Sequence, residues 1–202
     1  MTQAPEPRAA RLRRMLEITD SPVIEPNNDA KRLFSVFRAI AYCRRKYGEH
    51  AMGALLVRHC AGVDDVLAAL LLARWADIHS ADGTIGIDVV PCFENGAELK
   101  RSSAAMQSLM DDPFYRRNLA ARGLHQTVML AISDAAADGS VTASRWNMQR
   151  AHTELGTLFE AAGVDYTFFH GRGSLSGRGG VSDGIAHGHL RATEHGEAVN
   201  ER

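Results

Sequence analysis

Short apolar runs alternate with longer amphipathic stretches along most of this chain of 202 residues. Apolar runs bounded by turn residues are typical of buried strands, and apolar residues at helical spacing predict helices. Strands that alternate with helices form a parallel sheet with helices outside it, so the sequence predicts a helix-rich α/β fold. The expected strands are 54–58, 85–93, 128–132 and 166–169, and the expected helices are 29–47, 63–76, 97–110 and 140–162, with a further helical turn from Pro113.

Two of the expected helices carry an apolar face that we expect to pack inward. These faces consist of Leu33, Phe34, Phe37, Ile40 and Ala41 in the first helix and of Val63, Val66, Leu67, Leu70 and Leu71 in the second. The first residues carry several arginines, but no apolar core of a signal peptide follows them. We expect residues 1–26 to form a mobile arm and residues 27–202 to form one domain.

Charge and cysteine content exclude several classes of protein. The chain has 23 Lys and Arg residues against 24 Asp and Glu residues, a balance that indicates no nucleic-acid partner and no membrane partner. No apolar run is long enough to cross a bilayer. Cys43, Cys60 and Cys92 are widely spaced in apolar stretches and lack metal-ligand spacing, so we expect buried thiols in a reducing, cytoplasmic compartment.

A glycine-rich segment follows the last expected strand. Residues 171–180 hold five glycines together with Arg172 and Arg178. Glycine lets the backbone approach a ligand closely, and arginine offers a planar fork of donors for phosphate or carboxylate. The segment matches neither a P-loop nor the dinucleotide-binding fingerprint. From spacing alone, an anion-handling active site and an ordinary flexible loop both remain open.

Polar residues stand at the ends of three successive expected strands. Glu94 closes the second strand, Asp134 the third, and His170 and Arg172 the fourth. In a barrel of strand–helix units, reactive groups collect at the C-terminal ends of the strands, so we expect these side chains at one mouth. The alternatives are that either carboxylate caps a helix or lies in a solvated loop, and that His170 has a structural role.

The segment from His170 to Gly180, HGRGSLSGRGG, resembles the His-Gly-Arg-Gly-Gly-x-x-Gly-Arg-Gly-Gly signature of phosphoenolpyruvate carboxylases. Further segments are similar to segments of that family in the same order, from about Asp29 to the C-terminus: 65–67, 89–94, 128–134 with Asp138, 143–146 and 190–197. The family is built on an eight-stranded β/α barrel of the TIM type with many added helices. The resemblance implies that this chain forms about half of such a barrel.

The resemblance also implies the activity of a lyase that takes part in carbon dioxide fixation. The family joins phosphoenolpyruvate and bicarbonate, using Mg²⁺ or Mn²⁺, to give phosphate and oxaloacetate, an intermediate of the tricarboxylic acid cycle. Bicarbonate attacks the phosphorus to give carboxyphosphate and the enolate of pyruvate, which then captures carbon dioxide. Hard divalent cations prefer carboxylate oxygens, and by resemblance Glu94 and Asp134 are the metal ligands.

By the same resemblance, the glycine-rich segment acts on the substrate. The catalytic residues that it implies are His170, Arg172 and Arg178, and the substrate-binding positions are Arg172, Gly173 and Gly179. Arg172 holds the phosphate, Arg178 covers carboxyphosphate and keeps water away, and His170 orients the segment. We expect residues 171–182 to form an exposed lid in which Arg178 has no fixed partner before ligand binds.

The chain departs from the family pattern at several positions. Ala137 stands where the family has a lysine thought to help hold bicarbonate, and Ser174 replaces a loop glycine. Arg58 and His59 follow a strand where the family has small or apolar residues; they either compensate for the lysine or serve a surface or packing role. Asp138 either lies near the site or caps the long helix. The family's upstream histidine motif and downstream phosphate-binding arginines do not occur in this chain.

Three functional hypotheses follow from these features. The chain is a segment of a phosphoenolpyruvate carboxylase that works with a complementary chain or as a homo-oligomer. Alternatively, it is a non-catalytic remnant or interaction module of the same fold. The third hypothesis is a different lyase or phosphotransfer enzyme that uses the same metal and arginine residues. Neighbouring reading frames that encode the missing motifs would favour a split enzyme.

We predict that the isolated chain does not turn over phosphoenolpyruvate. Four strand–helix units do not close an eight-stranded barrel. The catalytic groups of the family act as one unit, so the loss of several of them should remove nearly all activity. The measurement is a coupled assay for oxaloacetate with phosphoenolpyruvate, bicarbonate and Mg²⁺. Steady turnover that Arg178→Ala abolishes would show that this chain is a complete enzyme.

Overall fold

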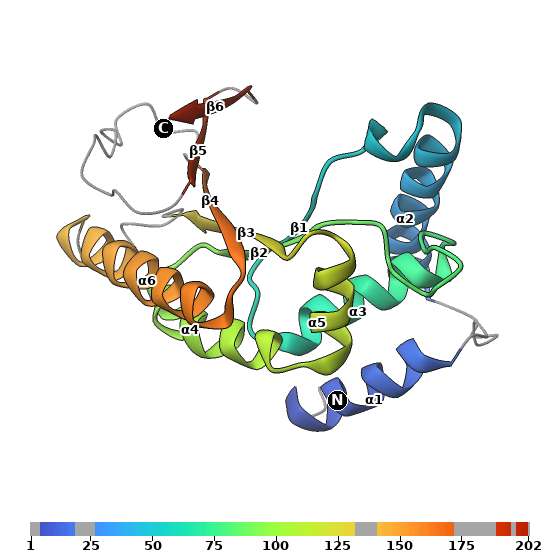
Figure 1. Ribbon diagram of the computed structural model, residues 1–202, viewed down its shortest axis with the longest axis horizontal. Coiled ribbons are helices and arrows are strands. Elements are labelled where there is room, and N and C mark those ends of the chain that lie inside the picture. Colours follow the sequence, from blue (N-terminus) through green and yellow to red (C-terminus); the bar gives the residue numbers. More distant parts are fainter. Residues whose placement is uncertain (1–4, 19–26, 132–140, 172–188, 195–196, 202) are drawn as a thin grey trace. The chain divides into compact units, whose positions relative to one another are not determined.

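The computed structural model describes residues 5–18, 27–131, 141–171, 189–194 and 197–201 (Figure 1). The chain divides into two compact units, each built from separate stretches of sequence. The first consists of Met1–Leu55 and Val63–Val89, and the second of Leu56–Gly62 and Val90–Arg202. The expected boundary between residues 26 and 27 stays a prediction.

Helix α1 (Pro5–Glu17) lies within the segment that we expect to be a mobile arm, and it packs on α3 (Val63–Trp75) in the first unit. Leu16 is fully buried, and Nη1 of Arg8 lies 2.6 Å from Asp64 and 3.1 Å from Asp65, in the first turn of α3. The arm therefore contains a docked helix, because its apolar residues recur at helical spacing and its arginine meets the acidic start of α3.

Helix α2 (Asn28–Tyr47) begins at a side-chain cap and ends at a glycine, before the short 3₁₀ helix η1 (Glu49–Ala51). The Ala30 N–H donates to Oδ1 of Asn27 at 2.8 Å, and the helix ends at Gly48, where φ is 100°. The expected inward face is confirmed for Phe37, Ile40 and Ala41, which are buried. It is wrong for Leu33, which is 51% exposed, and only partial for Phe34, which is half-buried.

Helix α3 confirms its expected apolar face almost completely. Four of the five expected residues, Val66, Leu67, Leu70 and Leu71, are buried, and Val63 at the first position is half-buried. The helix also buries Ala69 and Ala73, so most of its circumference is covered. Because α3 lies between other elements of its unit, only a small part of its surface is polar.

The second unit holds a six-stranded sheet, apart from the first residues of β1 and β2, which belong to the first unit. The strands are β1 (Leu55–Val57), β2 (Val89–Phe93), β3 (His125–Ala131), β4 (Asp165–Gly171), β5 (His189–Glu194) and β6 (Glu197–Glu201), and they lie in this order across the sheet. Strands β2 to β5 pair in parallel, and β6 pairs with β5 antiparallel. The predicted α/β fold with a parallel sheet is confirmed. The expected strand 85–93 is shorter than predicted, since only Val89–Phe93 is paired.

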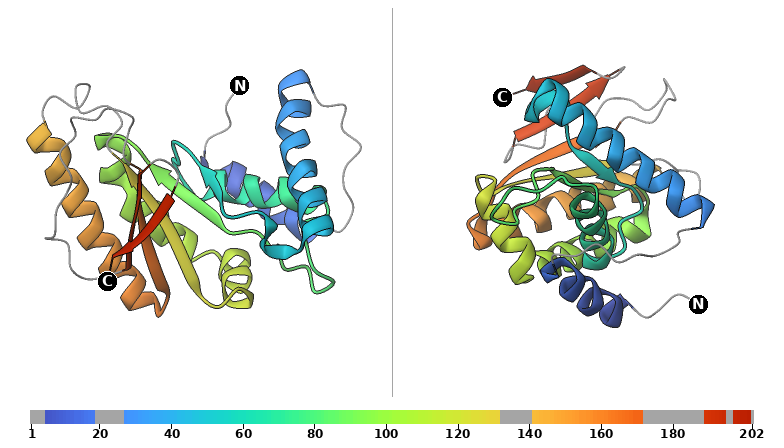
Figure 2. Two further views of the ribbon diagram at one scale, coloured as in Figure 1. Left: turned by 90° about the horizontal axis from the view of Figure 1, so that it is seen from above. Right: turned by 90° about the vertical axis from the view of Figure 1, so that its right-hand side faces the viewer.

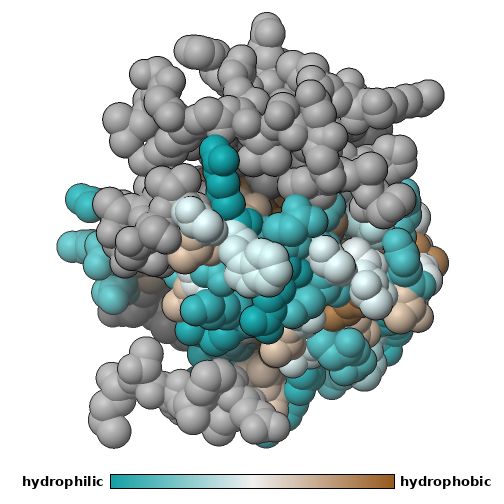
Figure 3. Space-filling view, turned by 90° about the vertical axis from the view of Figure 1, so that its left-hand side faces the viewer, coloured by the Kyte–Doolittle hydropathy of each residue, from teal (hydrophilic) through white to brown (hydrophobic). Residues whose placement is uncertain are grey.

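Three helices of the second unit accompany the sheet: α4 (Gly96–Met110), α5 (Pro113–Ala121) and α6 (Val141–Ala162). Helices α4 and α6 lie side by side along one face of the strands, α6 contacts β4 and α5 contacts β3 (Figures 1 and 2). On the side where α6 lies, the described surface is mostly hydrophilic with small scattered apolar spots (Figure 3). Within the described ranges, no helix has the length and apolarity needed to cross a membrane.

An aromatic cluster joins α6 to β4 and confirms that the run 166–169 is a buried strand. The Phe159 ring centroid lies 5.4 Å from that of Tyr166 and 6.4 Å from that of Phe168, and the His152 and Phe168 centroids are 4.2 Å apart. Phe159 and Phe168 are completely buried. This packing fixes the strand whose carboxyl end leads into the glycine-rich segment.

We predict that Phe159→Ala destabilises the chain by about 3–5 kcal/mol, because it leaves a cavity against β4. Trp146→Ala is the control, since Trp146 lies on the same helix and is 70% exposed. It should change the free energy of unfolding by less than about 0.5 kcal/mol. Urea unfolding followed by circular dichroism measures both. Equal effects for the two variants would contradict the assignment of α6 as the core helix.

Candidate functional site

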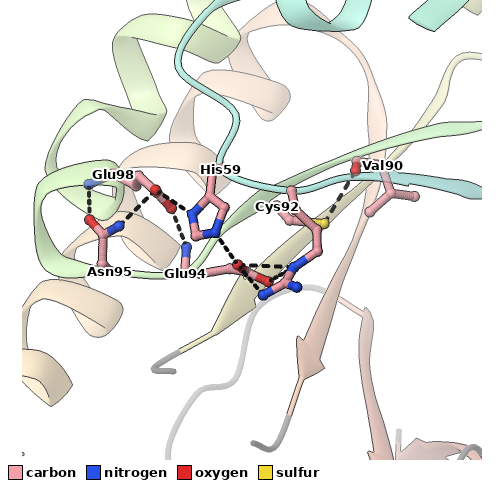
Figure 4. Close-up of polar contacts among 7 residues, drawn as sticks. His59, Val90, Cys92, Glu94, Asn95 and Glu98 are labelled. Carbon is pink, nitrogen blue, oxygen red and sulfur yellow. Dashed lines mark hydrogen bonds and ion pairs between the residues drawn. The ribbon is translucent and has the colours of Figure 1, made fainter. Parts of the chain in front are cut away.

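The candidate functional site lies at the carboxyl ends of β1 and β2, which are neighbours in the sheet. Arg58 and His59 follow β1, and Glu94 follows β2 at the point where α4 begins. The backbone N–H of Cys60 donates to the carbonyl oxygen of Cys92 at 3.1 Å and holds the two strand ends together. Side chains that leave adjacent strands at this edge therefore meet, as Figure 4 shows for His59 and Glu94.

The carboxylate of Glu94 is almost fully buried and is bound on both oxygens by Arg58. The Arg58 Nε donates to Oε1 at 2.9 Å and to Oε2 at 3.2 Å, and Nη2 donates to Oε2 at 2.9 Å. The Glu94 side chain is 5% exposed, whereas the Arg58 side chain is 65% exposed. The hydrogen bonds to Glu94 raise the pKa of Arg58. This is a bidentate, charge-assisted ion pair in which the carboxylate of Glu94 is buried and the guanidinium of Arg58 is solvated.

His59 lies between two carboxylates. Its Nδ1 is 2.9 Å from Oε1 of Glu98, and its Nε2 is 3.4 Å from Oε2 of Glu94. An ionised carboxylate only accepts hydrogen bonds, so Nδ1 carries a hydrogen toward Glu98. The backbone of His59 has φ 52°, in the left-handed region that few non-glycine residues adopt. This conformation turns the chain after β1 so that the imidazole faces the start of α4.

Glu98 fixes the start of α4 and the backbone of Glu94 together. Its Oε2 accepts the Glu94 N–H at 2.7 Å, and its Oε1 accepts from Asn95 Nδ2 at 2.7 Å. Asn95 Oδ1 in turn accepts the Glu98 N–H at 2.9 Å, the reciprocal pattern of a capped helix start (Figure 4). Burial acts to raise the pKa of Glu98, but the Glu94 N–H, His59 and Asn95 together hold this pKa below its usual value.

The thiol of Cys92 lies beside this cluster but is chemically quiet. Burial, with the nearby charge of Glu94, raises the pKa of Cys92 to about 12, and its Sγ donates to the Val90 carbonyl at 3.4 Å. A protonated, buried thiol is neither a nucleophile nor a ready metal ligand. None of the three cysteines forms a disulfide; Cys60 and Cys92 are buried as expected, and Cys43 is half-buried.

The structure describes only part of the expected site. Glu94 lies at the end of β2, as predicted. His170 lies in β4, where its backbone pairs in register with Leu130 of β3. The other expected residues fall outside the described residues; they are Asp134, Arg172, Gly173, Arg178 and Gly179, together with Ala137, Asp138, Ser174 and all of the expected lid beyond Gly171. The shared mouth of these strands and the lid therefore stay predictions.

Among the described residues, no group of three or more His, Cys, Asp or Glu side chains is arranged to hold a metal ion. Asn95 and Glu98 were not among the residues expected at the site. An asparagine followed three residues later by a glutamate at the start of a helix is a recognisable capping pattern, so a signal was present. Arg58 and His59 stood out only as departures from a family pattern, and their contact with Glu94 depends on strand pairing.

Comparisons with known proteins agree on one family. A family model described as phosphoenolpyruvate carboxylase matches residues 6–202. The chain is 40% identical over 190 residues to phosphoenolpyruvate carboxylase from Xanthomonas oryzae pv. oryzae, a match that covers 90% of this chain and 21% of the relative. The Chromobacterium violaceum protein of the same name is 35% identical over 194 residues, or 90% of this chain and 22% of the relative. The chain spans about a fifth of the length of these relatives.

We predict that Glu98 makes the chain sensitive to acid. Its pKa is lowered on folding, so its stabilisation is present above the ordinary value of 4.5 and is lost as the pH falls through the lower folded-state pKa. Glu98→Gln removes this charge, so the variant should be less stable at neutral pH and should lose less stability on acidification. Glu154→Gln is the control, because Glu154 is a partly exposed carboxylate on α6 that lies outside this cluster. Parallel stability curves for wild type and Glu98→Gln between about pH 6 and 3 would contradict the prediction.

Proposed function

The chain belongs to the phosphoenolpyruvate carboxylase family, and from this premise we propose that it supplies part of an active site that joins phosphoenolpyruvate to bicarbonate, giving oxaloacetate and phosphate. The observation that carries the proposal is the buried carboxylate of Glu94 at the carboxyl end of a parallel strand. Enzymes with strand–helix folds place their reacting groups at this edge. A buried acid at such a position is costly to maintain, which favours a functional role.

We also propose that the sheet is part of a TIM-type barrel. The strands lie across the sheet in the order of the sequence, and β2 to β5 are parallel, as in the wall of such a barrel. Helices α4 and α6, which follow β2 and β3, lie on one face of the sheet, as the outer helices of a barrel do. The antiparallel strand β6 departs from this pattern.

Glu94 and Asp134 are the proposed ligands of Mg²⁺ or Mn²⁺. The chemistry of Glu94 fits this role, because a buried carboxylate at a strand end offers hard, negatively charged oxygens. When bound, the cation would stabilise negative charge as it develops on the enolate oxygen. The residues of the chain would do the rest by binding and orienting the substrates and by excluding water.

The residues after β4 are the proposed binding site for the transferred phosphate. Strand β4 ends at Gly171, so the chain passes from a rigid, buried strand directly into the glycine-rich segment. Arg172 would hold the phosphate of phosphoenolpyruvate, with Gly173 and Gly179 allowing close approach of the backbone. Arg178 would cover carboxyphosphate, and His170, the next-to-last residue of β4, would orient the segment. A cytoplasmic location is part of the proposal and is supported by three cysteines that form no disulfide.

A second candidate function is a non-catalytic module of the same fold. The observation that favours it is the Arg58–Glu94 pair, which occupies both oxygens of the proposed metal ligand. Ala137 adds to this argument, because it lacks the charge that the family lysine offers to bicarbonate. Under this hypothesis the Arg58–Glu94 pair only stabilises the strand ends, and the chain functions by binding another protein chain.

The two functions can be separated by grafting residues 29–194 into the corresponding segment of a full-length relative. If the segment is catalytic, the folded chimera should form oxaloacetate, and Glu94→Gln or Arg178→Ala should lower kcat by about 10²–10³-fold. Glu154→Gln, a change at a partly exposed position of α6, should leave kcat unchanged. A chimera that folds and assembles as the full-length relative does, but forms no oxaloacetate, would favour the non-catalytic module.

A further inference from the structure

We propose that Arg58 is a built-in competitor of the divalent cation at Glu94, so that the cation binds only when the guanidinium leaves the carboxylate. The inference rests on the proposed metal role of Glu94. It adds a residue of this chain that controls whether that role can be exercised. Arg58 lies outside the expected ligand set and outside the glycine-rich segment.

The geometry of the pair makes the two occupants exclusive. Arg58 donates to both oxygens of Glu94 at 2.9–3.2 Å, and His59 Nε2 lies 3.4 Å from one of them. A divalent cation needs the same lone pairs at a shorter distance, and it carries the same sign of charge as the guanidinium. Repulsion between the two positive charges adds to this competition for the carboxylate. The cation and Arg58 therefore cannot share the carboxylate.

The structure also indicates which partner moves. Glu94 is held in place, because its side chain is 5% exposed and its backbone N–H is bonded to Glu98. Arg58 is the mobile partner, because its side chain is 65% exposed and can return to water without burying its charge. His59 is tied by its Nδ1 to Glu98, so it stays when Arg58 leaves. Departure of this exposed side chain would release the lone pairs of Glu94 that Arg58 occupies.

The competition also explains how the chain tolerates Glu94 without a metal. A buried carboxylate without a partner is strongly destabilising, and the guanidinium removes that cost in the metal-free chain. When a cation binds, it replaces the guanidinium as the neutralising charge. The same residue thus stabilises the metal-free state and weakens metal binding, and its loss should change both properties in opposite directions.

The test is a titration of the 202-residue chain with Mn²⁺, with free Mn²⁺ measured by electron paramagnetic resonance. Arg58→Gln should bind Mn²⁺ on the order of tenfold more tightly than wild type, because no charge-assisted pair has to be broken. Arg58→Lys keeps a charge but lacks the planar fork, so its affinity should lie between the two. Arg150→Gln is the matched control; it removes an exposed pair with Glu154 on α6 and should leave Mn²⁺ binding unchanged.

The outcomes separate this inference from the proposed function. Glu94→Gln should abolish the tight binding in both the wild-type and the Arg58→Gln backgrounds. If Arg58→Gln binds Mn²⁺ no better than wild type while Glu94→Gln still weakens binding, Arg58 is not a competitor, and the metal role of Glu94 stands. If Glu94→Gln changes nothing in either background, the metal role of Glu94 fails and the inference falls with it.

A second measurement covers the case in which Arg58→Gln destabilises the chain. Its melting temperature without metal should be lower than that of wild type, and saturating Mn²⁺ should raise it by more than it raises that of wild type, because a ligand that binds the folded state tightly stabilises it. An equal Mn²⁺ shift in the two proteins would overturn the inference. Arg150→Gln should follow wild type in both conditions.

Discussion

The buried negative charge at the end of β2 is the constraint on which the arrangement of the site depends. Glu94 and Glu98 place two carboxylates near each other with little access to water. Each is stabilised in a different way: Glu94 by an arginine from the neighbouring strand end, and Glu98 by a backbone N–H, an asparagine and a histidine. The turn after β1, the cap of α4 and the end of β2 are thereby joined into one hydrogen-bonded network.

Under our proposal, this network gives Glu94 two incompatible uses. As an ion pair with Arg58, Glu94 stabilises the strand ends and needs no cofactor. As a cation ligand, it would serve the chemistry that the family carries out. Buried ion pairs contribute modestly to stability compared with apolar packing, so stability alone is a weak reason for the pair. The difference in exposure between the two partners instead suits an exchange of one positive charge for another.

The sequence predicted elements whose identity depends on local patterns. The apolar face of α3, the helix that begins at Pro113, the long helix α6 and the aromatic strand β4 all follow from spacing and turn residues. It did not predict α1, because an arginine-rich start gives no sign of the acidic helix turn that binds it. Strands β5 and β6 were also missed; their sequences are short and polar, and β5 pairs with β4 and β6 with β5 through the backbone.

The sequence by itself determined the α/β class, the family and the position of Glu94 at a strand end, because each of these is written in residues that are close together in the chain. Only the tertiary structure decided what Glu94 contacts. Arg58 and Glu94 are 36 residues apart, and they meet because β1 lies beside β2 in the sheet. Strand order is set by packing across the whole unit, so the carboxylate that the family resemblance proposes as a metal ligand is held by an arginine in the fold.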